Sequence, residues 1–289
     1  MLWGDWQDLP KFGQVSDAVL QEILDGGQSF RWKLVDPEKF LWQGVIGNIV
    51  LQVQNQTGNS PRYRTLKGET YHKPIYTYFG SETDWQKIIN DLPWRSDHEL
   101  KTCLDTFPGL RILRQPFGET LFSFICSTAK QIPHIKQCCE NVAKRFGNQL
   151  IEDEHAWPGW QKLAEVSEDE LRECKLGYRA KYISAIAQIL GKDDDFEGKV
   201  EQADYKDAKK ILMALPGVGE KVADCVLLFG AGKLEAFPVD TWIIKAMQRI
   251  YHLENWDQGK VAQFGRVHLG KHAGLAQQFL FARERKLSV

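Results

Sequence analysis

The stretch Leu215-Pro216-Gly217-Val218-Gly219-Glu220-Lys221-Val222-Ala223-Asp224 lies between two segments whose apolar residues follow a helical period. The two glycines permit a tight turn, and we expect the amides of Gly217, Val218 and Gly219 to face outward where the second helix begins. Gly-x-Gly alone would also fit an ordinary interhelical turn. The longer pattern predicts a helical hairpin at about residues 205–230, whose N–H donors and positive dipole end suit an anion such as phosphate.

Two ionisable residues near this hairpin are candidates for catalysis. Lys221 falls in the first turn of the second helix, and Cys225, four residues later, shares its helix face. Asp240 follows in Pro238-Val239-Asp240-Thr241-Trp242, where an aspartate suits the N-cap of a helix. A lysine amine is a nucleophile when it is neutral. A solvated lysine or a simple helix cap would explain either residue alone, but together they favour a catalytic pair.

The composition is that of an ordinary folded protein. Of the 289 residues, 43% are hydrophobic and 26% charged, and the formal net charge is -1 at pH 7. These values exclude a disordered or fibrous chain. No apolar run approaches the roughly 20 residues that a membrane helix needs, and the N-terminus lacks the features of a signal peptide. We therefore expect a soluble intracellular protein with no membrane association and no secretion signal.

The charge and the cysteines limit the possible partners and cofactors. A near-neutral balance does not indicate a nucleic-acid binder, but it does not exclude one, because only the charge of the binding face matters. The cysteines form no Cys-x-x-Cys pair, and none follows Cys225, which excludes an iron–sulfur cluster near the C-terminus. We expect reduced, packed thiols, no metal and no cofactor.

The predicted elements divide the chain into a β-rich part and a helical part. Short aromatic and β-branched runs predict strands at residues 30–34, 40–46, 49–54 and 74–79. Turn-forming residues within 54–62 predict a surface loop. From about Glu82 the apolar spacing becomes helical and predicts helices at residues 120–128, 133–146, 179–190 and 206–215.

Two local signals support the helical part. Ser167-Glu168-Asp169-Glu170 predicts a capping box, and Pro133 suits the first turn of its helix. The fold class predicted is α+β. A small antiparallel β domain would occupy residues 1–100, and a helical domain that contains the hairpin would occupy residues 101–289.

Five separated blocks resemble the 8-oxoguanine DNA glycosylases, a family of the helix-hairpin-helix DNA glycosylase superfamily. The segment from Leu215 to Trp242 resembles the superfamily's hairpin, Gly/Pro-rich loop and aspartate. The other blocks are G-G-Q-S-F-R-W at residues 26–32, L-F-S-F-I-C-S at 121–127, L-G-Y-R-A-K-Y at 176–182, and Ala276-Gln277 with Leu280-Phe281. They appear in family order over roughly residues 15–285.

The resemblance implies a bifunctional DNA glycosylase and AP lyase. Lys221 would attack C1′ of the damaged nucleotide while the N-glycosidic bond breaks. The resulting Schiff base would undergo β-elimination of the 3′ phosphate. Asp240 would stabilise the positive charge of the oxocarbenium-like transition state. The hairpin residues Gly217, Val218 and Gly219 would bind DNA phosphates.

The resemblance also implies a pocket for the flipped base. The carbonyl of Gly27 would accept a hydrogen bond from N7–H, a donor that 8-oxoguanine has and guanine lacks. Gln277 would read the Watson–Crick edge with its amide. Phe281 would stack on one face of the base, and Cys225 would lie against the other; a plain core aromatic is the alternative for Phe281.

The contacts to the opposite strand depart from the family pattern. Eukaryotic members have asparagine where this chain has Ala129 and a cytosine-contacting arginine where it has His134. A second such arginine is kept as Arg179, and Tyr178 remains to wedge the opposite strand. Alanine makes no hydrogen bond to a base, and histidine cannot form the arginine fork. We therefore expect a relaxed preference for cytosine.

Two pocket positions depart as well. Trp242 stands where those members have a phosphate-contacting histidine, and Phe229 stands where methionine is common. Such changes suggest a bacterial-type branch. The implied partner is double-stranded DNA containing oxidised guanine, bound by a monomer. The implied location is the cytoplasm or nucleoid of a bacterium, or the nucleus of a eukaryote.

Two other readings stay open at this point. An alkylated-base DNA glycosylase would share the fold and Asp240, but usually needs no lysine nucleophile. A non-catalytic helix-hairpin-helix DNA-binding protein would explain the hairpin, but not a lysine and an aspartate both placed at helix starts. An adenine glycosylase or endonuclease of the iron–sulfur branch is disfavoured by the missing C-terminal cysteines.

Overall fold

The structure is a computed structural model that describes residues 2–56, 59–69 and 71–287. Within these ranges the N-terminal part contains a five-stranded antiparallel sheet of order β1-β5-β4-β3-β2. Its strands are β1 (Gln7–Asp8), β2 (Trp32–Asp36), β3 (Leu41–Ile46), β4 (Ile49–Gln54) and β5 (Arg62–Thr65). Trp42, Val53 and Tyr63 are cross-strand neighbours and are all buried, so they form one apolar row across the sheet.

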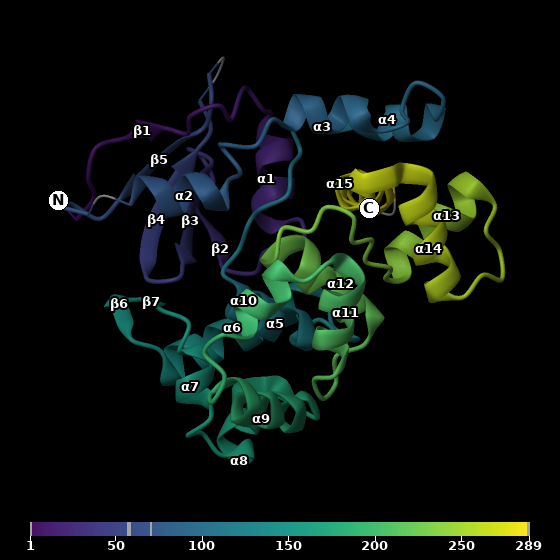
Figure 1. The fold of residues 1–289 in the computed structure, drawn as a ribbon. Coiled ribbons are helices and arrows are strands. Elements are labelled where there is room, and N and C mark those ends of the chain that lie inside the picture. Colours follow the sequence, from purple (N-terminus) through teal and green to yellow (C-terminus); the bar gives the residue numbers. More distant parts are fainter. Residues whose placement is uncertain (1, 57–58, 70, 288–289) are drawn as a thin grey trace.

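Helices make up most of the rest of the chain (Figure 1). Those before residue 150 are α1 (Asp17–Asp25), α2 (His72–Tyr78), α3 (Trp85–Asp91), α4 (His98–Thr106), α5 (Phe117–Cys126) and α6 (Ile132–Phe146). A short hairpin of β6 (Gln149–Ile151) and β7 (Glu154–His155) follows. Next come α7 (Gly159–Leu163), α8 (Glu168–Leu171), a kinked turn at Arg172–Leu176, α9 (Arg179–Leu190) and α10 (Phe196–Gln202).

The C-terminal part completes the fold. It contains α11 (Tyr205–Met213), α12 (Glu220–Cys225), the π-helical turn Val226–Gly230, α13 (Thr241–Tyr251), α14 (Gln258–Leu269), a 3₁₀ turn at Gly270–His272 and α15 (Ala273–Leu287). Figure 1 shows the sheet at the upper left, α7–α9 at the bottom and α13 and α14 at the right, with α5 near the centre. Nearly every residue of α5 is buried, including Glu119, which forms an ion pair of 2.6 Å with Arg31. No helix in the described ranges is both long and apolar enough to cross a membrane.

Most of the predicted elements are confirmed. The helix predicted at 179–190 coincides with α9, and those predicted at 120–128, 133–146 and 206–215 correspond to α5, α6 and α11 within three residues at each end. Ser167 and Glu170 form the predicted capping box, and Pro133 lies in the first turn of α6. The strands predicted at 40–46 and 49–54 are β3 and β4, and the α+β class is confirmed.

The strand predicted at residues 74–79 is wrong, because this segment belongs to α2. Ile75, Tyr78 and Phe79 are buried while Thr77 is exposed, which is a helical period rather than a strand alternation. Pro74 is tolerated because it lies in the first turn. The Tyr78 hydroxyl lies 2.9 Å from Trp32 Nε1 and 3.1 Å from Ser29 Oγ, so tertiary contacts override the β propensity of this run.

The boundaries also differ from the prediction in places. Helical structure starts with α1 and α2, well before Glu82, so the first hundred residues are less β-rich than predicted. The strand predicted at 30–34 begins at Trp32. The loop predicted at 54–62 includes Thr57 and Gly58, which lie outside the described residues. The division of the chain at residue 100, which lies in α4, remains a prediction.

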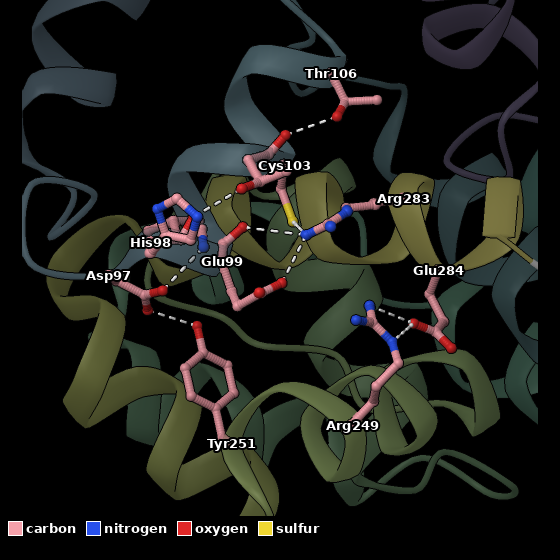
Figure 2. Close-up of polar contacts among 11 residues, drawn as sticks. Asp97, His98, Glu99, Cys103, Thr106, Arg249, Tyr251, Arg283 and Glu284 are labelled. Carbon is pink, nitrogen blue, oxygen red and sulfur yellow. Dashed lines mark hydrogen bonds and ion pairs between the residues drawn. The ribbon is translucent and has the colours of Figure 1, made fainter.

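Polar contacts join α4 to the C-terminal helices (Figure 2). Asp97, at the N-cap of α4, accepts a hydrogen bond of 2.7 Å from the Tyr251 hydroxyl, and Arg283 of α15 forms an ion pair of 2.8 Å with Glu99. Arg249 of α13 pairs with Glu284 of α15 at 2.9 Å. These contacts fix α15, one face of which lines the site described below.

Candidate active site

The hairpin between α11 and α12 is built as the sequence predicts, with one exception. Gly217 has φ +76°, and a Cβ there would lie 2.5 Å from the Tyr182 ring, so only glycine fits. Gly219 is the N-cap of α12, and a Cβ there would meet nothing within 4 Å, which leaves its backbone open to close approach. The amide of Val218, however, donates to Leu215 O at 3.2 Å, so it does not face outward as expected.

Lys221 lies in the first turn of α12, as predicted. Its Nζ donates to Ser127 Oγ at 2.8 Å and lies 5.1 Å from the centre of the Phe124 ring. Both partners come from α5 or its C-cap, so the central helix sets the position of the amine. Sequence reasoning gave neither residue a role. Ser127 was within a recognised motif, but no local signal joins residues 94 positions apart.

Asp240 is the N-cap of α13, also as predicted. Its Oδ1 accepts hydrogen bonds from the amides of Trp242 at 3.0 Å and Ile243 at 2.9 Å. These two amides belong to the first turn of α13, so they hold the carboxylate in a fixed direction at the start of the helix. The same aspartate thus caps a helix and lines the space in front of Lys221.

Three cavities meet at this lysine and aspartate. One of about 880 Å³ runs along the hairpin past Gly217, Gly219 and Trp242. A second of about 570 Å³ extends from the pair toward Gly27 and Phe281. A third of about 40 Å³ lies deeper, and its wall contains Gly27, Cys225, Gln277 and Phe281 together with both members of the pair. The structure therefore brings all four predicted base-recognition residues to one small cavity beside the predicted catalytic pair.

The residues of this cavity have distinct chemical properties. Gln277 is buried, and its Nε2 donates to Pro238 O at 3.1 Å, which fixes the direction of the amide. Gly27 has φ +105°, and a Cβ there would lie 3.1 Å from Ile132 Cδ1 and 3.5 Å from the Phe281 ring. Burial raises the pKa of the Cys225 thiol to about 12, so this residue is a neutral, packed side chain next to Lys221.

An ion pair holds the backbone just before Gly27. Arg285 of α15 donates to the carbonyl of Gly26 and to Glu22 Oε1, the latter at 3.2 Å. The amide of Gly26 in turn bonds to Glu22 O at 3.0 Å. Burial raises the pKa of Glu22 to about 7; Arg285 opposes this rise and Asp25 adds to it. The folded protein therefore retains the proton on this carboxyl to a higher pH than the unfolded chain does, and the ion pair with Arg285 forms as the proton is lost.

The variant Glu22→Gln tests this assignment. A carboxyl whose pKa rises from 4.5 to about 7 on folding destabilises the protein progressively as pH rises between these values. We expect the free energy of unfolding of the variant, relative to wild type, to increase by about 2 kcal/mol between pH 5 and pH 8. Urea unfolding at both pH values measures it. Parallel pH profiles for the two proteins would contradict the assignment.

The predicted opposite-strand residues lie in different environments. Tyr178 is 52% exposed and His134 is exposed in the first turn of α6, so both are accessible. Arg179 is only 5% exposed; it donates to the carbonyl of Thr128 and its guanidinium lies 4.4 Å from the centre of the Tyr178 ring. In this state Arg179 positions the loop before Ala129, and a contact with cytosine remains a prediction. Trp242 is half-buried and lines both larger cavities.

The fold and this site together define a class. A helical hairpin followed by a loop and an aspartate, with a lysine of the hairpin at the same cavity, is the arrangement of helix-hairpin-helix base-excision glycosylases. Two family models agree. Residues 13–121 match 8-oxoguanine DNA glycosylase, N-terminal domain, and residues 122–267 match HhH-GPD superfamily base excision DNA repair protein.

Individual relatives extend this match over the whole chain. The probable N-glycosylase/DNA lyase of Methanothermobacter thermautotrophicus is 33% identical, over 94% of this chain and 95% of that protein. N-glycosylase/DNA lyase OGG1 of Arabidopsis thaliana is 28% identical, over 93% of this chain and 78% of its own. The Clostridium acetobutylicum 8-oxoguanine glycosylase/lyase, solved with double-stranded DNA containing cytosine opposite 8-oxoguanine, superimposes with a TM-score of 0.88 at 31% identity and covers 100% of both chains. The chain belongs to the 8-oxoguanine DNA glycosylase family, which confirms the resemblance found in its motifs.

Proposed function

We propose that the protein removes 8-oxoguanine from double-stranded DNA and then cleaves the strand at the resulting abasic site. One observation carries the proposal. Lys221 and Asp240, from the starts of two different helices, line the same cavities, and the deepest of these also contains Gly27, Gln277 and Phe281. Membership of the family supports the substrate and both activities.

The proposed reaction begins at the Lys221 amine. The neutral amine attacks C1′ as the N-glycosidic bond breaks, and the electron pair of that bond leaves with the base, which takes up a proton. Opening of the sugar ring gives a Schiff base between Lys221 and C1′. Loss of a proton from C2′ then expels the 3′ phosphate by β-elimination. The hydrogen bond from Nζ to Ser127 Oγ supports this role, because it holds the amine at the junction of the cavities.

Asp240 supplies charge stabilisation in this proposal. An ionised carboxylate near C1′ lowers the energy of an oxocarbenium-like transition state because it faces developing positive charge. Two backbone amides fix its direction, so the group requires little reorganisation during the reaction.

Base recognition requires the small cavity to open. A volume of about 40 Å³ holds about one or two water molecules and is too small for a purine. Phe281 lines both this cavity and the 570 Å³ cavity, so we propose that its ring moves to admit the base and then stacks on it. Gly27 would accept from N7–H, Gln277 would read the Watson–Crick edge, and the neutral Cys225 would lie against the second face of the base.

Opposite-base preference should be weak. With Ala129 and His134 in place of asparagine and arginine, we expect excision opposite cytosine to exceed excision opposite adenine or thymine by less than about 100-fold, since a good bidentate base contact contributes about 1–3 kcal/mol. Single-turnover rates on the corresponding duplexes measure this ratio. A preference of several hundred-fold would contradict the role assigned to these positions.

A single variant should restore part of the preference. Ala129 has φ +52°, a conformation in which asparagine is more common than alanine. We therefore expect Ala129→Asn to leave the thermal stability unchanged or slightly higher, and to raise the preference for cytosine about 5-fold or more. Equal rates for wild type and variant opposite all four bases would show that this side chain does not reach the opposite strand.

Borohydride trapping tests the function as a whole. The wild-type protein is incubated with a duplex that contains one 8-oxoguanine, and with the matched undamaged duplex, in the presence of sodium borohydride. We expect a covalent protein–DNA adduct with the damaged duplex only. Base release without an adduct would indicate a monofunctional glycosylase that uses water. Neither adduct nor release would favour the alkylated-base reading, which a 3-methyladenine duplex tests directly.

The assembly and location are part of the same proposal. One chain contains the hairpin, the nucleophile, the aspartate and the base pocket, so we propose that a monomer acts on DNA. We propose that it is located with the genomic DNA, in the nucleoid of a bacterium or the nucleus of a eukaryote. Light scattering of the protein with a 15- to 20-base-pair duplex tests the stoichiometry, and one protein per duplex is the expected result.

A further inference from the structure

Gln278 is a buried residue of the base pocket whose side-chain N–H group has no hydrogen-bond partner among the described residues. Its side chain lies on α15 next to Gln277, is 2% exposed, and lines the 40 Å³ cavity. Its Nε2 has no hydrogen-bond partner among the residues that the structure describes. A buried N–H group left unpaired lowers stability, and at the wall of a cavity such a group is available to donate to a bound ligand.

The neighbouring glutamine presents the opposite chemical group. Gln277 commits its Nε2 to Pro238 O, and its Oε1 has no partner within the described part of the chain. The cavity wall therefore offers an acceptor from Gln277 and a donor from Gln278. Phe281 lies four residues after Gln277 and three after Gln278, so all three residues share one side of α15.

This pair of groups fits the six-membered ring of 8-oxoguanine. The ring presents two donors, N1–H and the 2-amino group, followed by one acceptor, O6. The free Oε1 of Gln277 can accept from the donors, but O6 requires a donor from the protein. O6 lies between N1 and N7 on the base, and Gln278 lines the same cavity as Gln277 and Gly27, the residues that face those two positions in the proposed function.

We infer that Gln278 is a second base-reading residue whose amide donates to O6 of the excised base. The inference rests on the proposed function and deepens it. Gln277 and Gln278 together select a 6-oxo purine with N1–H, and disfavour a 6-amino purine, whose N1 acceptor and amino donor would face groups of the same kind. Gln278 thus contributes specificity, while Lys221 and Asp240 perform the chemistry.

The variant Gln278→Met tests this role, because methionine has a similar length and helix propensity but no amide. We expect kcat/KM on 8-oxoguanine to fall about 10- to 100-fold. We also expect the melting temperature to stay unchanged or rise by a few degrees, because the unpaired N–H is removed. Gln263→Met on the exposed face of α14 is the control, and should change neither quantity.

Substrate analogues separate recognition from structure. The loss caused by Gln278→Met should persist on 8-oxohypoxanthine, which keeps O6 but lacks the 2-amino group. It should shrink below about 3-fold on 2-amino-8-oxopurine, which lacks O6 but keeps the 8-oxo group. Equal losses on all three bases, or a lower melting temperature, would overturn the inference in favour of a structural role. If wild type fails to excise 8-oxoguanine, the proposed function itself is wrong; if wild type excises it and the variant does so equally well, only the inference is wrong.

Discussion

Lys221→Gln should abolish both excision and strand cleavage while leaving the fold and DNA binding in place. In the wild type, Lys221 Nζ donates a hydrogen bond of 2.8 Å to Ser127 Oγ. Glutamine keeps a polar side chain at this position, but its amide nitrogen has no basic lone pair and cannot form a Schiff base. We expect single-turnover excision of 8-oxoguanine to fall by about 10³-fold or more. The borohydride adduct should disappear in parallel.

The same experiment needs a fold control and a charge control. Unfolding free energy should change by about 1 kcal/mol or less, since one hydrogen bond is at stake. Lys206→Gln, on the exposed side of α11, removes the same charge from the hairpin without touching the cavity, and should keep full activity. Excision by Lys221→Gln within 10-fold of wild type would mean that another nucleophile acts.

Asp240→Asn and Asp240→Ala should lose activity alike but differ in stability. Asparagine is a good N-cap and can still accept from the amides of Trp242 and Ile243, whereas alanine cannot. Neither neutral side chain stabilises positive charge at C1′. We expect excision to fall about 10²- to 10³-fold in both variants, and unfolding free energy to fall by about 1 kcal/mol in the alanine variant only.

A second aspartate cap provides the matched control. Asp204 caps α11 and accepts from the amide of Asp207 at 2.9 Å, away from the cavities. Asp204→Ala should lose about the same stability as Asp240→Ala, with no loss of excision. If the two alanine variants lost activity equally, the effect of Asp240 would be one of helix capping rather than of charge. Thermal melts and single-turnover rates on the same preparations decide between the two.

The site shows which residues a sequence can reveal. The hairpin with Lys221, the cap at Asp240, and the α15 residues Gln277 and Phe281 belong to short blocks whose spacing along a helix is fixed by local geometry. Pattern and resemblance were therefore sufficient to select them. Ser127 and Gln278 lay within or beside recognised blocks, but no local pattern selects them. Ser127 is singled out by the hydrogen bond that it accepts from Lys221 across the fold. Gln278 is singled out because its Nε2 has no hydrogen-bond partner among the described residues.

The same distinction explains the errors. Residues 74–79 have the β propensity of a strand, but Tyr78 is held by Trp32 and Ser29 from another part of the chain, and the helix buries Ile75 and Phe79 as well. Arg179 is buried and donates to the Thr128 carbonyl, which its charge alone does not indicate, and its contact with cytosine stays a prediction. Val218 has an amide in an exposed turn, but that amide closes the turn onto Leu215.

The sequence by itself determined the α+β class and the family and selected Lys221 and Asp240 as candidates, because each depends on residues close together in the chain or on motifs read directly. Only the tertiary structure decided that α5, α12, α13 and α15 meet at one cavity of about 40 Å³, which Phe281 also lines. Only it showed that Gln278 is buried there with no partner for its Nε2 among the described residues. The physical reason is that burial and hydrogen bonding depend on groups distant in sequence, which local patterns do not specify.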